Sequence, residues 1–339
     1  MKNNLYIISN ESISLENNIY RCDNIDLKSI PESLQLSSFN VFLLARKSKA
    51  KRTKSINLKN IKIFSNIFFY IFEILKNIKN KNNNYLVISI TPYTFLAIIF
   101  LKLFKEKPFV YLRSDGFKEY KAILGLCGSL IYYFMFNIAA KLSFLIACRE
   151  HLLIKKKGKV VHPSQLNEKW FINQSIKIEK PNNLLYVGRI RIEKGIFSLI
   201  KILENSNLNL TIVSPEIVNK IPEMPKNVSI INFENSNDEI IKCYDSHSMF
   251  ILPSFTEAHP QVLDEALSRH KPVIIFEEIS HVARDRKGIF VSKRNITSLE
   301  ETVNYIIKNY ANIQIEIKKN ILPTKKQFIE ELKDILIKK

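Results

Sequence analysis

Short apolar runs alternate with longer helix-like segments along the chain, and the pattern occurs twice. In the first half, apolar runs of strand length lie at 4–9, 39–45, 85–90, 108–113, 143–148 and 159–161. In the second half they lie at 183–188, 208–214, 228–233, 249–254, 271–276 and 288–292. Strands that are apolar on both faces indicate parallel sheets covered by helices on either side. The pattern therefore predicts an α/β fold with two doubly wound sheets.

Helix-like segments fill the gaps at 65–79, 92–105, about 119–141, 195–204, 237–245, 261–269 and 297–310. A polar stretch at 164–182 separates the two halves, and 339 residues exceed what one simple core holds. We expect a Rossmann-like domain at 1–170, a second at 183–320 and a final amphipathic helix at 321–339. Ligands of such sheets bind at the carboxyl ends of the strands, and a cleft between two domains is the usual site.

The net charge of +19 is concentrated in the first half of the chain. Residues 1–180 hold 29 Lys and Arg against 12 Asp and Glu, whereas residues 181–339 hold 22 against 20. A basic domain favours an anionic partner. Eight cations lie within 46–62, which we interpret as a docking segment for an anionic membrane surface or, alternatively, as a solvated loop. No nucleic-acid-binding motif accompanies these cations, so no nucleic-acid partner is expected.

The compartment is indicated by two features. The four cysteines are scattered without a C-x-x-C pair, which favours a reduced cytosolic setting over a disulfide framework or a zinc ribbon. The apolar run near the N-terminus covers only 5–8, whereas a secretory signal needs roughly 7–15 residues. Both features favour a cytoplasmic protein.

Residues 122–140 form an uncharged stretch of membrane-spanning length. As a straight helix they would extend about 28 Å, close to the thickness of a bilayer core. A membrane span is one interpretation. Their position between two strands of one predicted sheet favours a buried core helix, or a helix that partly faces a membrane.

Two cations stand where a predicted strand passes into a helix, in the sequence YVGRIRIEKG at 186–195. The strand ends at Gly188, Arg189 follows it, and Lys194 with Gly195 opens the helix. Cations beside a helix N-terminus form an anion site. A diphosphate suits this site, because arginine binds phosphate bidentately and lysine supplies a point charge. The alternative is a solvated basic turn.

Two glutamates follow another predicted strand, in PSFTEAHPQVLDEAL at 253–267. Glu257 lies in the loop, and Glu265 lies on the helix that begins near Pro260. Backbone N–H groups around 259–262 would point at a ligand there. A carboxylate can accept hydrogen bonds from two vicinal hydroxyls of a ribose or a hexose. Alternatively, Glu257 caps the helix and Glu265 is a surface residue.

Together the two motifs resemble those of glycosyltransferase family 4, the retaining glycosyltransferases of the GT-B fold. The family pattern is a G-R-x(4)-K-G turn, then a P-S-x(2)-E-x(7)-E loop and helix, then a K-P-V-I strand. This chain has Gly188-Arg189, Lys194-Gly195, Pro253-Ser254, Glu257, Glu265 and Lys271-Pro272-Val273-Ile274 at those places. The resemblance is close over about 180–310 and weaker at 147–153 and 160–171. It implies two Rossmann-like domains facing a central cleft, with the last helix returning to the first domain.

The resemblance also implies roles for the motif residues. Arg189 and Lys194 would hold the diphosphate of a nucleotide-sugar donor, expected to be a UDP- or GDP-sugar, and Glu265 would bind the ribose. Glu257 and backbone amides near His259 would bind the donor sugar. The expected donor site is Gly188, Arg189, Lys194, Phe233, Glu257, His259, Pro260, Gln261, Val262 and Glu265, with Phe233 at the base. No cofactor and no metal are expected, because the cations and the helix end neutralise the leaving diphosphate.

The chain departs from the family pattern at three places. Ser9-Asn10-Glu11 follows the first strand in place of a glycine-rich loop, and Ala258 replaces the glycine after the first glutamate. Where many members have a histidine after an N-domain strand, this chain reads Arg113-Ser114-Asp115-Gly116. We expect these two charges to contact the acceptor or the sugar, or alternatively to pair and fix the loop. The candidate catalytic residues are Glu257, Arg189, Lys194, Asp115 and Arg113.

The predicted function is a retaining glycosyltransferase, peripheral on the inner face of the cytoplasmic membrane. Its acceptor would be a lipid-linked glycan, a glycolipid or a surface polysaccharide or lipopolysaccharide. One alternative is a GT-B nucleotide-sugar epimerase, which would release a free sugar without an acceptor and leaves the basic first half unexplained. Another is a catalytically silent, nucleotide-binding partner of a transferase, which the retained Arg189, Lys194, Glu257 and Glu265 argue against.

Overall fold

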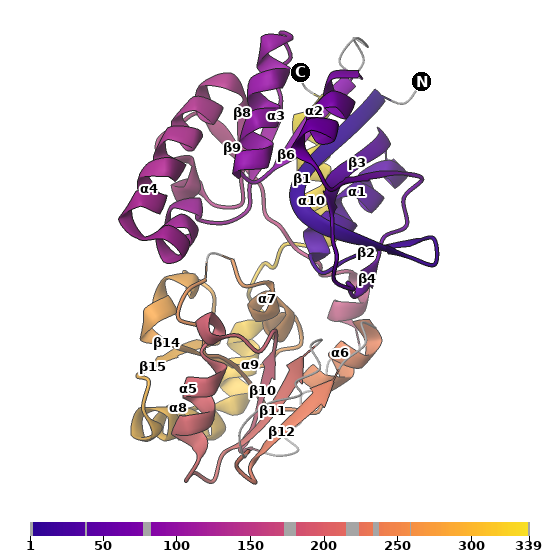
Figure 1. Cartoon of the computed structure of the whole chain (residues 1–339). Helices are drawn as coiled ribbons and strands as arrows, with labels where there is room; N and C mark the ends of the chain where they lie inside the picture. Colours follow the sequence, from indigo (N-terminus) through magenta and orange to yellow (C-terminus); the bar gives the residue numbers. More distant parts are fainter. Residues whose placement is uncertain are drawn as a thin grey trace. The chain divides into compact units, whose positions relative to one another are not determined.

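Two α/β units make up the computed structural model, which describes residues 3–37, 39–76, 83–172, 181–214, 224–232, 237–257 and 259–337. Tertiary contacts divide the chain into an N-terminal unit, Met1–His162 with Lys326–Lys339, and a C-terminal unit, Pro163–Lys325. Each unit has a mainly parallel sheet and an apolar core of its own (Figure 1). The predicted fold class of two parallel-sheet α/β domains is confirmed.

The parallel strands of the N-terminal unit follow the order β5-β3-β1-β6-β7-β8-β9. Their bounds are β1 (Asn3–Glu16), β3 (Phe39–Lys47), β5 (Asn60–Phe64), β6 (Asn83–Ile88), β7 (Phe109–Leu112), β8 (Phe144–Ala147) and β9 (Gly158–Val160). Every residue of β6 and β7 is buried, as continuous apolar runs require. β1 extends beyond the predicted run and pairs antiparallel with β2 (Ile19–Cys22), which pairs with β4 (Lys54–Ser55). The basic segment 46–62 therefore contains parts of three strands and is not a single loop.

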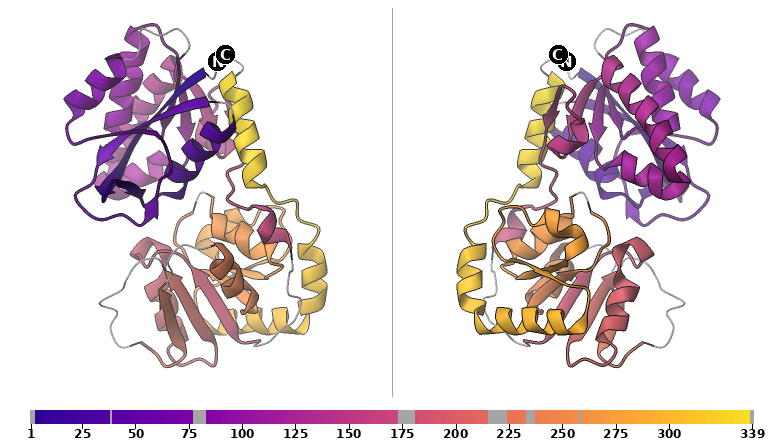
Figure 2. Two further views of the ribbon diagram at one scale, coloured as in Figure 1. Left: turned by 90° about the vertical axis from the view of Figure 1, so that its right-hand side faces the viewer. Right: turned by 90° about the vertical axis from the view of Figure 1, so that its left-hand side faces the viewer.

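The helices of the N-terminal unit are α1 (Ile25–Ser37), α2 (Ile67–Lys76), α3 (Pro92–Leu103), α4 (Gly116–Leu142) and α10 (Lys325–Ile337). The C-terminal helix α10 packs on this unit (Figure 2). Its Phe328 ring lies 6.2 Å from the ring of Tyr111 on β7, centroid to centroid. Asn84 of β6 donates from Nδ2 to the Leu336 carbonyl at 3.3 Å. The last helix thus completes the core of the first unit.

Helix α4 covers the predicted helix at 119–141 but is not straight. Gly125 has φ 65° and ψ −149°, which interrupts the helix. A Cβ on Gly128 would lie 2.0 Å from the Tyr120 carbonyl oxygen, whereas residues eight apart in a straight helix are separated by about 12 Å. The arm 116–124 therefore folds back on the arm 126–142.

This reversal corrects two of the interpretations of residues 122–140. By length and composition, α4 is the one helix among the described residues that could cross a membrane. Because the chain turns back at Gly125, however, this stretch does not form the straight helix of about 28 Å that a span needs. It is not a buried core helix either, since only 28% of its most apolar 18-residue stretch is buried.

The sheet of the C-terminal unit is parallel throughout its described strands, in the order β12-β11-β10-β13-β14-β15. The strands are β10 (Asn183–Val187), β11 (Asn209–Ser214), β12 (Val228–Asn232), β13 (Met249–Leu252), β14 (Val273–Phe276) and β15 (Ile289–Ser292). The helices are α5 (Ile196–Leu203), α6 (Asn237–Asp245), α7 (Gln261–Ser268), α8 (Ile296–Lys308) and α9 (Tyr310–Ile317). Strand order reverses between β10 and β13, which is where sheets of this kind bind ligands.

Candidate active site

The two predicted motifs meet at the point where strand order reverses. The chain leaving β10 forms the short helix η3 (Ile192–Lys194), and the chain leaving β13 contains Glu257. Lys194 Nζ lies 2.6 Å from Glu257 Oε1. The backbone of Phe255 donates to the Glu193 carbonyl at 3.0 Å. A cation from one motif and a carboxylate from the other thus form an ion pair between residues 63 positions apart in sequence.

Gly195 allows the two loops to approach so closely. Its φ of 67° is in the left-handed region, and a Cβ at this position would lie 1.9 Å from the Pro253 carbonyl oxygen. Any other residue would push the two loops apart. Gly195 also begins α5, so the glycine of the motif sets the start of the helix as well as the contact.

Arg189 is the second cation that the sequence predicts for this site. Its side chain is exposed, and the buried Tyr186 donates from its hydroxyl to the Arg189 carbonyl at 2.8 Å. This bond fixes the turn after Gly188 at the end of β10. The guanidinium therefore projects from an anchored backbone at the carboxyl edge of the sheet.

Glu257 is held on three sides. Besides Lys194, Ser254 donates from Oγ to Glu257 Oε1 at 2.7 Å, and a ring nitrogen of His281 lies 2.9 Å from the Glu257 carbonyl. The first turn of α7 has Pro260 at its N-cap and no side-chain cap. The alternative that Glu257 caps this helix is therefore wrong, and its carboxylate belongs to the contact between the loops.

Glu265 lies half-buried on α7, not on the open surface. Tyr244 of α6 donates from its hydroxyl to Glu265 Oε2 at 3.0 Å and approaches the Val262 carbonyl at 3.2 Å. Burial and then the Glu265 charge raise the pKa of Tyr244 well above its ordinary value, so the tyrosine stays a donor. The carboxylate is thereby oriented, and the alternative of an ordinary surface residue is wrong.

The other predicted donor residues lie at the start of α7. His259 places its Nε2 2.7 Å from the Pro163 carbonyl, so its ring contacts the protein and any ligand contact falls to its backbone. Gln261 and Val262 are half-buried in the first turn. Phe233, predicted at the base, lies outside the described residues.

One residue that supports the site was missed from the sequence. Arg294, in the loop after β15, lies over the rings of Phe255 at 4.2 Å and Phe276 at 4.3 Å. It donates to Glu278 Oε1 at 2.6 Å and to the Ser254 carbonyl at 3.4 Å. Arg294 therefore holds the Ser254–Phe255 segment in place. Its partners come from two separate segments of the chain, 254–255 and 276–278, and no local motif marks them.

Arg113 and Asp115, predicted in the first half, lie at the carboxyl end of β7. Arg113 pairs with Glu11 at 3.1 Å and with Asp26 at 4.0 Å. Asp115 Oδ1 accepts two backbone N–H bonds from the first turn of α4, at 3.1 and 3.2 Å. The alternative that these two residues pair with each other is therefore wrong, because each is held by other partners.

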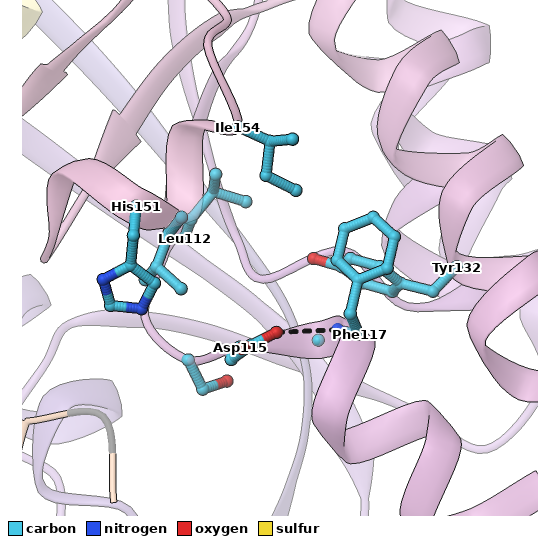
Figure 3. A pocket seen from close by; sticks show the side chains of 9 residues that line it. Leu112, Asp115, Phe117, Tyr132, His151 and Ile154 are labelled. Carbon is cyan, nitrogen blue, oxygen red and sulfur yellow. Dashed lines mark hydrogen bonds between the residues drawn. The ribbon is translucent and has the colours of Figure 1, made fainter. Parts of the chain in front are cut away.

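A pocket of about 240 Å³ opens beside Asp115. Figure 3 shows Asp115 and His151 on one side of it and Phe117 and Tyr132 on the other. The full lining is Leu112, Ser114, Asp115, Gly116, Phe117, Tyr132, His151, Leu152 and Ile154. Ligand pockets usually measure about 300–1,000 Å³, so this one is smaller than most. Among the described residues, no group of three or more His, Cys, Asp or Glu could hold a metal ion.

Comparisons with known proteins found a family match for part of the chain and structural matches for almost all of it. Residues 168–322 match the family model described as glycosyl transferases group 1. A comparison with curated proteins found no match. In a comparison with solved structures, sucrose-phosphate synthase from Thermosynechococcus elongatus is similar with a TM-score of 0.65 at 13% identity, over 98% of both chains.

Two further solved structures are similar over almost the whole length. HepE of Anabaena, in complex with UDP and glucose, has a TM-score of 0.66 at 11% identity over 100% of both chains. WaaG, a glycosyltransferase involved in lipopolysaccharide biosynthesis, has a TM-score of 0.66 at 13% identity, over 98% of this chain and 100% of that one. Residues 168–322 are thus similar to the glycosyl transferases group 1, and the chain as a whole has the GT-B fold of these solved structures.

Proposed function

We propose that the protein is a retaining glycosyltransferase that moves a sugar from a UDP- or GDP-sugar to a lipid-linked glycan or lipopolysaccharide acceptor. The observation that carries this proposal is the contact between Lys194 and Glu257, 2.6 Å apart, at the reversal of strand order. An anchored Arg189 lies at the end of the adjoining strand. Two cations and a carboxylate at that point suit a ligand that joins a diphosphate to a sugar.

In this proposal the C-terminal unit binds the donor. Arg189 and Lys194 hold the diphosphate, and the oriented carboxylate of Glu265 accepts from the ribose hydroxyls. Glu257 and the backbone near His259 bind the hydroxyls of the donor sugar. The complex of HepE with UDP and glucose, a protein of the same fold, supports a nucleotide-sugar donor.

The reaction breaks the bond between the anomeric carbon and the diphosphate oxygen, and the electron pair leaves with the diphosphate. The acceptor hydroxyl oxygen bonds to the same face of that carbon, and its proton passes to the diphosphate oxygen that leaves. Lys194 and Arg189 stabilise the charge that develops on the leaving group, which fixed cations do without reorganisation. We assign no protein nucleophile, and the proposed chemistry needs no metal because these cations neutralise the diphosphate.

The acceptor is assigned to the N-terminal unit, at the inner face of the cytoplasmic membrane. The excess of 17 positive charges in residues 1–180 favours an anionic surface. The likeness to WaaG, which is involved in lipopolysaccharide biosynthesis, supports an acceptor of the same general class. Asp115 and the pocket beside it are the proposed contact with the acceptor sugar.

Thermal stabilisation by nucleotide sugars tests the donor assignment. UDP-, GDP-, ADP- and CMP-sugars are screened, and the correct donor at 100 times its Kd adds about 2.7 kcal/mol, which raises Tm by about 5–11 °C. The Lys194→Ala variant should lose this shift, whereas the exposed Lys201→Ala on α5 should keep it. No shift with any donor would contradict the proposal.

Product analysis then separates the remaining functions. With the stabilising donor and a membrane-lipid extract, a glycosylated lipid with the donor's anomeric configuration, read by NMR, is expected. A free sugar released without any acceptor would indicate an epimerase. Donor binding without turnover on any lipid extract would indicate a silent partner.

A further inference from the structure

The bend of α4 creates a helical hairpin with an apolar tip. The side chains of Ile123 and Leu126, on either side of Gly125, are 74% and 79% exposed. Large apolar side chains continue along the outer face of the second arm, all at least 41% exposed: Leu130, Ile131, Tyr133, Phe134 and Ile138. Contiguous exposed apolar patches on soluble domains mark interaction sites. The tip therefore needs a partner that removes these side chains from water.

The two arms of the hairpin are packed against each other at its base, so the hairpin is not a frayed helix end. The Phe117 ring of the first arm lies 4.8 Å from the Tyr132 ring of the second, and 5.8 Å from that of Phe136. A Cβ on Gly116 would lie 2.1 Å from Cζ of Tyr132, so a glycine is needed where the arms join. Aromatic packing thus holds the base together, while the tip buries little.

Exposed lysines lie on the first arm of the hairpin and beside its base. Lys118 and Lys121 lie on the first arm, and three exposed lysines, at 155–157, follow the short helix η1 (Glu150–Leu153). Ile154, next to this turn, lines the same pocket as Phe117 and Tyr132, so the lysine turn adjoins the hairpin base. Asp115, which lies 3.9 Å from Lys118, and Glu119 and Glu150 also lie here, so the five lysines outnumber the three acids.

An apolar tip on a hairpin with lysines on its first arm and beside its base fits an anionic lipid surface. Interfacial helices bury their apolar face about 5–10 Å into the boundary between headgroups and acyl chains, and each nearby lysine or arginine adds attraction to anionic lipid. A second copy fits less well, because a two-fold contact through this face would bring the same lysines together.

We propose that the α4 hairpin inserts its tip, residues 122–127, into the interfacial region of an anionic leaflet, with the lysines of its base on the headgroups. The pocket beside Asp115, which lies at the same base, then opens at headgroup level. This inference rests on the proposed function in one respect: it assigns that pocket to the head of a lipid-linked acceptor. The membrane contact itself is independent of the chemistry.

Cys127 in the tip provides a direct test. It is exposed, whereas Cys22 and Cys148 are buried, so a thiol-reactive environment-sensitive fluorophore labels it once Cys243 is replaced by serine. With vesicles of phosphatidylglycerol, the label should shift to the blue and be quenched by spin labels shallow in the acyl chains. With phosphatidylcholine vesicles it should change little. A label that stays in water while the protein is bound to vesicles would overturn the proposal.

Vesicle flotation with variants completes the test. Ile123→Ser with Leu126→Ser should weaken binding to phosphatidylglycerol at least about tenfold, since two large side chains no longer enter the lipid. Leu36→Ser, equally exposed on α1, is the matched control and should bind as before. UDP and GDP affinity, measured in parallel, should be unchanged because that site lies in the other unit.

Three results would overturn the membrane assignment. They are equal binding of the tip variant and the wild type, equal binding to neutral and anionic vesicles, and a dimer by light scattering that the tip variant dissociates. If the wild type bound neither UDP nor GDP, this would instead count against the proposed function, and the result for the membrane contact would still hold.

Discussion

Replacing Lys194 with methionine separates its structural role from its role in binding the donor. In the structure its ammonium pairs with Glu257 at 2.6 Å, and the two side chains are 23% and 11% exposed. Methionine keeps much of the apolar stem and removes the charge. Glu257 is then left with the Ser254 hydroxyl as its remaining side-chain donor among the contacts described above. The variant should therefore be less stable even without a ligand.

The size of the loss follows from the exposure of the pair. A hydrogen bond to a charged group contributes about 1.5–3 kcal/mol, and partial exposure of Lys194 reduces this to about 1–2 kcal/mol. For a unit of this size the loss lowers Tm by about 2–8 °C. The double variant Lys194→Met with Glu257→Gln should regain most of the stability, because no unpaired carboxylate remains.

Nucleotide affinity should not recover with stability. Both variants lack the ammonium assigned to the diphosphate, so UDP or GDP should bind about 10- to 150-fold more weakly by calorimetry. Lys201→Met, on the exposed face of α5, controls for lost charge. If the double variant bound with wild-type affinity, the role of Lys194 would be to order the loop and not to bind phosphate.

Three further perturbations test other parts of the structure. Arg269→Met breaks a bidentate pair between the buried Arg269 and the half-buried Asp245. The loss should cost about 2–4 kcal/mol in urea unfolding, less than for a fully buried pair, and adding Asp245→Asn should recover part of it. Wild-type stability of the single variant would refute this. Gly195→Ala places a Cβ 1.9 Å from the Pro253 carbonyl oxygen. The variant should lose more than about 1 kcal/mol in its free energy of unfolding and bind UDP or GDP more weakly. A wild-type Tm and affinity would contradict the close contact between the two loops. Burial lowers the pKa of His270 to about 4, so the unfolded chain takes up the proton first as pH falls below about 6.5. The free energy of unfolding should therefore drop by about 1 kcal/mol between pH 7 and 5, after allowance for solvent screening. It should drop less in His270→Asn, since asparagine tolerates the φ of 54° at this position. An equal pH dependence in the wild type and the variant would argue against this role of His270.

The strands and the donor motifs were predictable because both depend on local pattern and one topological rule. Runs such as residues 85–90 and 249–254 are apolar on both faces, which only a covered parallel sheet accommodates. The contact of Lys194 with Glu257 follows once β10 and β13 are neighbours, because the carboxyl ends of parallel strands share one edge. The positions of the two motifs after their strands were therefore sufficient to predict that Lys194 and Glu257 lie close together.

The N-terminal unit shows where local pattern was insufficient. Helix α1 was missed although Leu27, Ile30 and Leu34 are buried at helical spacing, because Pro31 within the helix suggests a break. The extension of β1 was missed because polar residues interrupt its alternation. The turn to β2 had a readable signal, since Asn17 and Asn18, both at positive φ, suit a two-residue hairpin.

The supports of the site depended on tertiary contacts. Arg294 and Tyr244 hold Ser254 and Glu265 from elements that are distant in sequence, so nothing near the motifs points to them. The fold-back of α4 depends on one glycine, Gly125, in a stretch whose composition fits a continuous helix equally well. The composition of α4 therefore predicted that the helix is apolar, but not that the chain reverses direction within it.

Calorimetric titration of UDP and GDP into the wild type and into Arg189→Ala and Glu265→Gln tests whether the C-terminal unit holds a nucleotide-sugar site. At least one nucleotide should bind the wild type, and both variants should bind it more weakly, Arg189→Ala by about 10- to 150-fold. Glu257→Gln should keep affinity for the bare nucleotide, because its assigned partner is the sugar. Unchanged affinity in both Arg189→Ala and Glu265→Gln would contradict the assignment of a nucleotide-sugar site to the C-terminal unit.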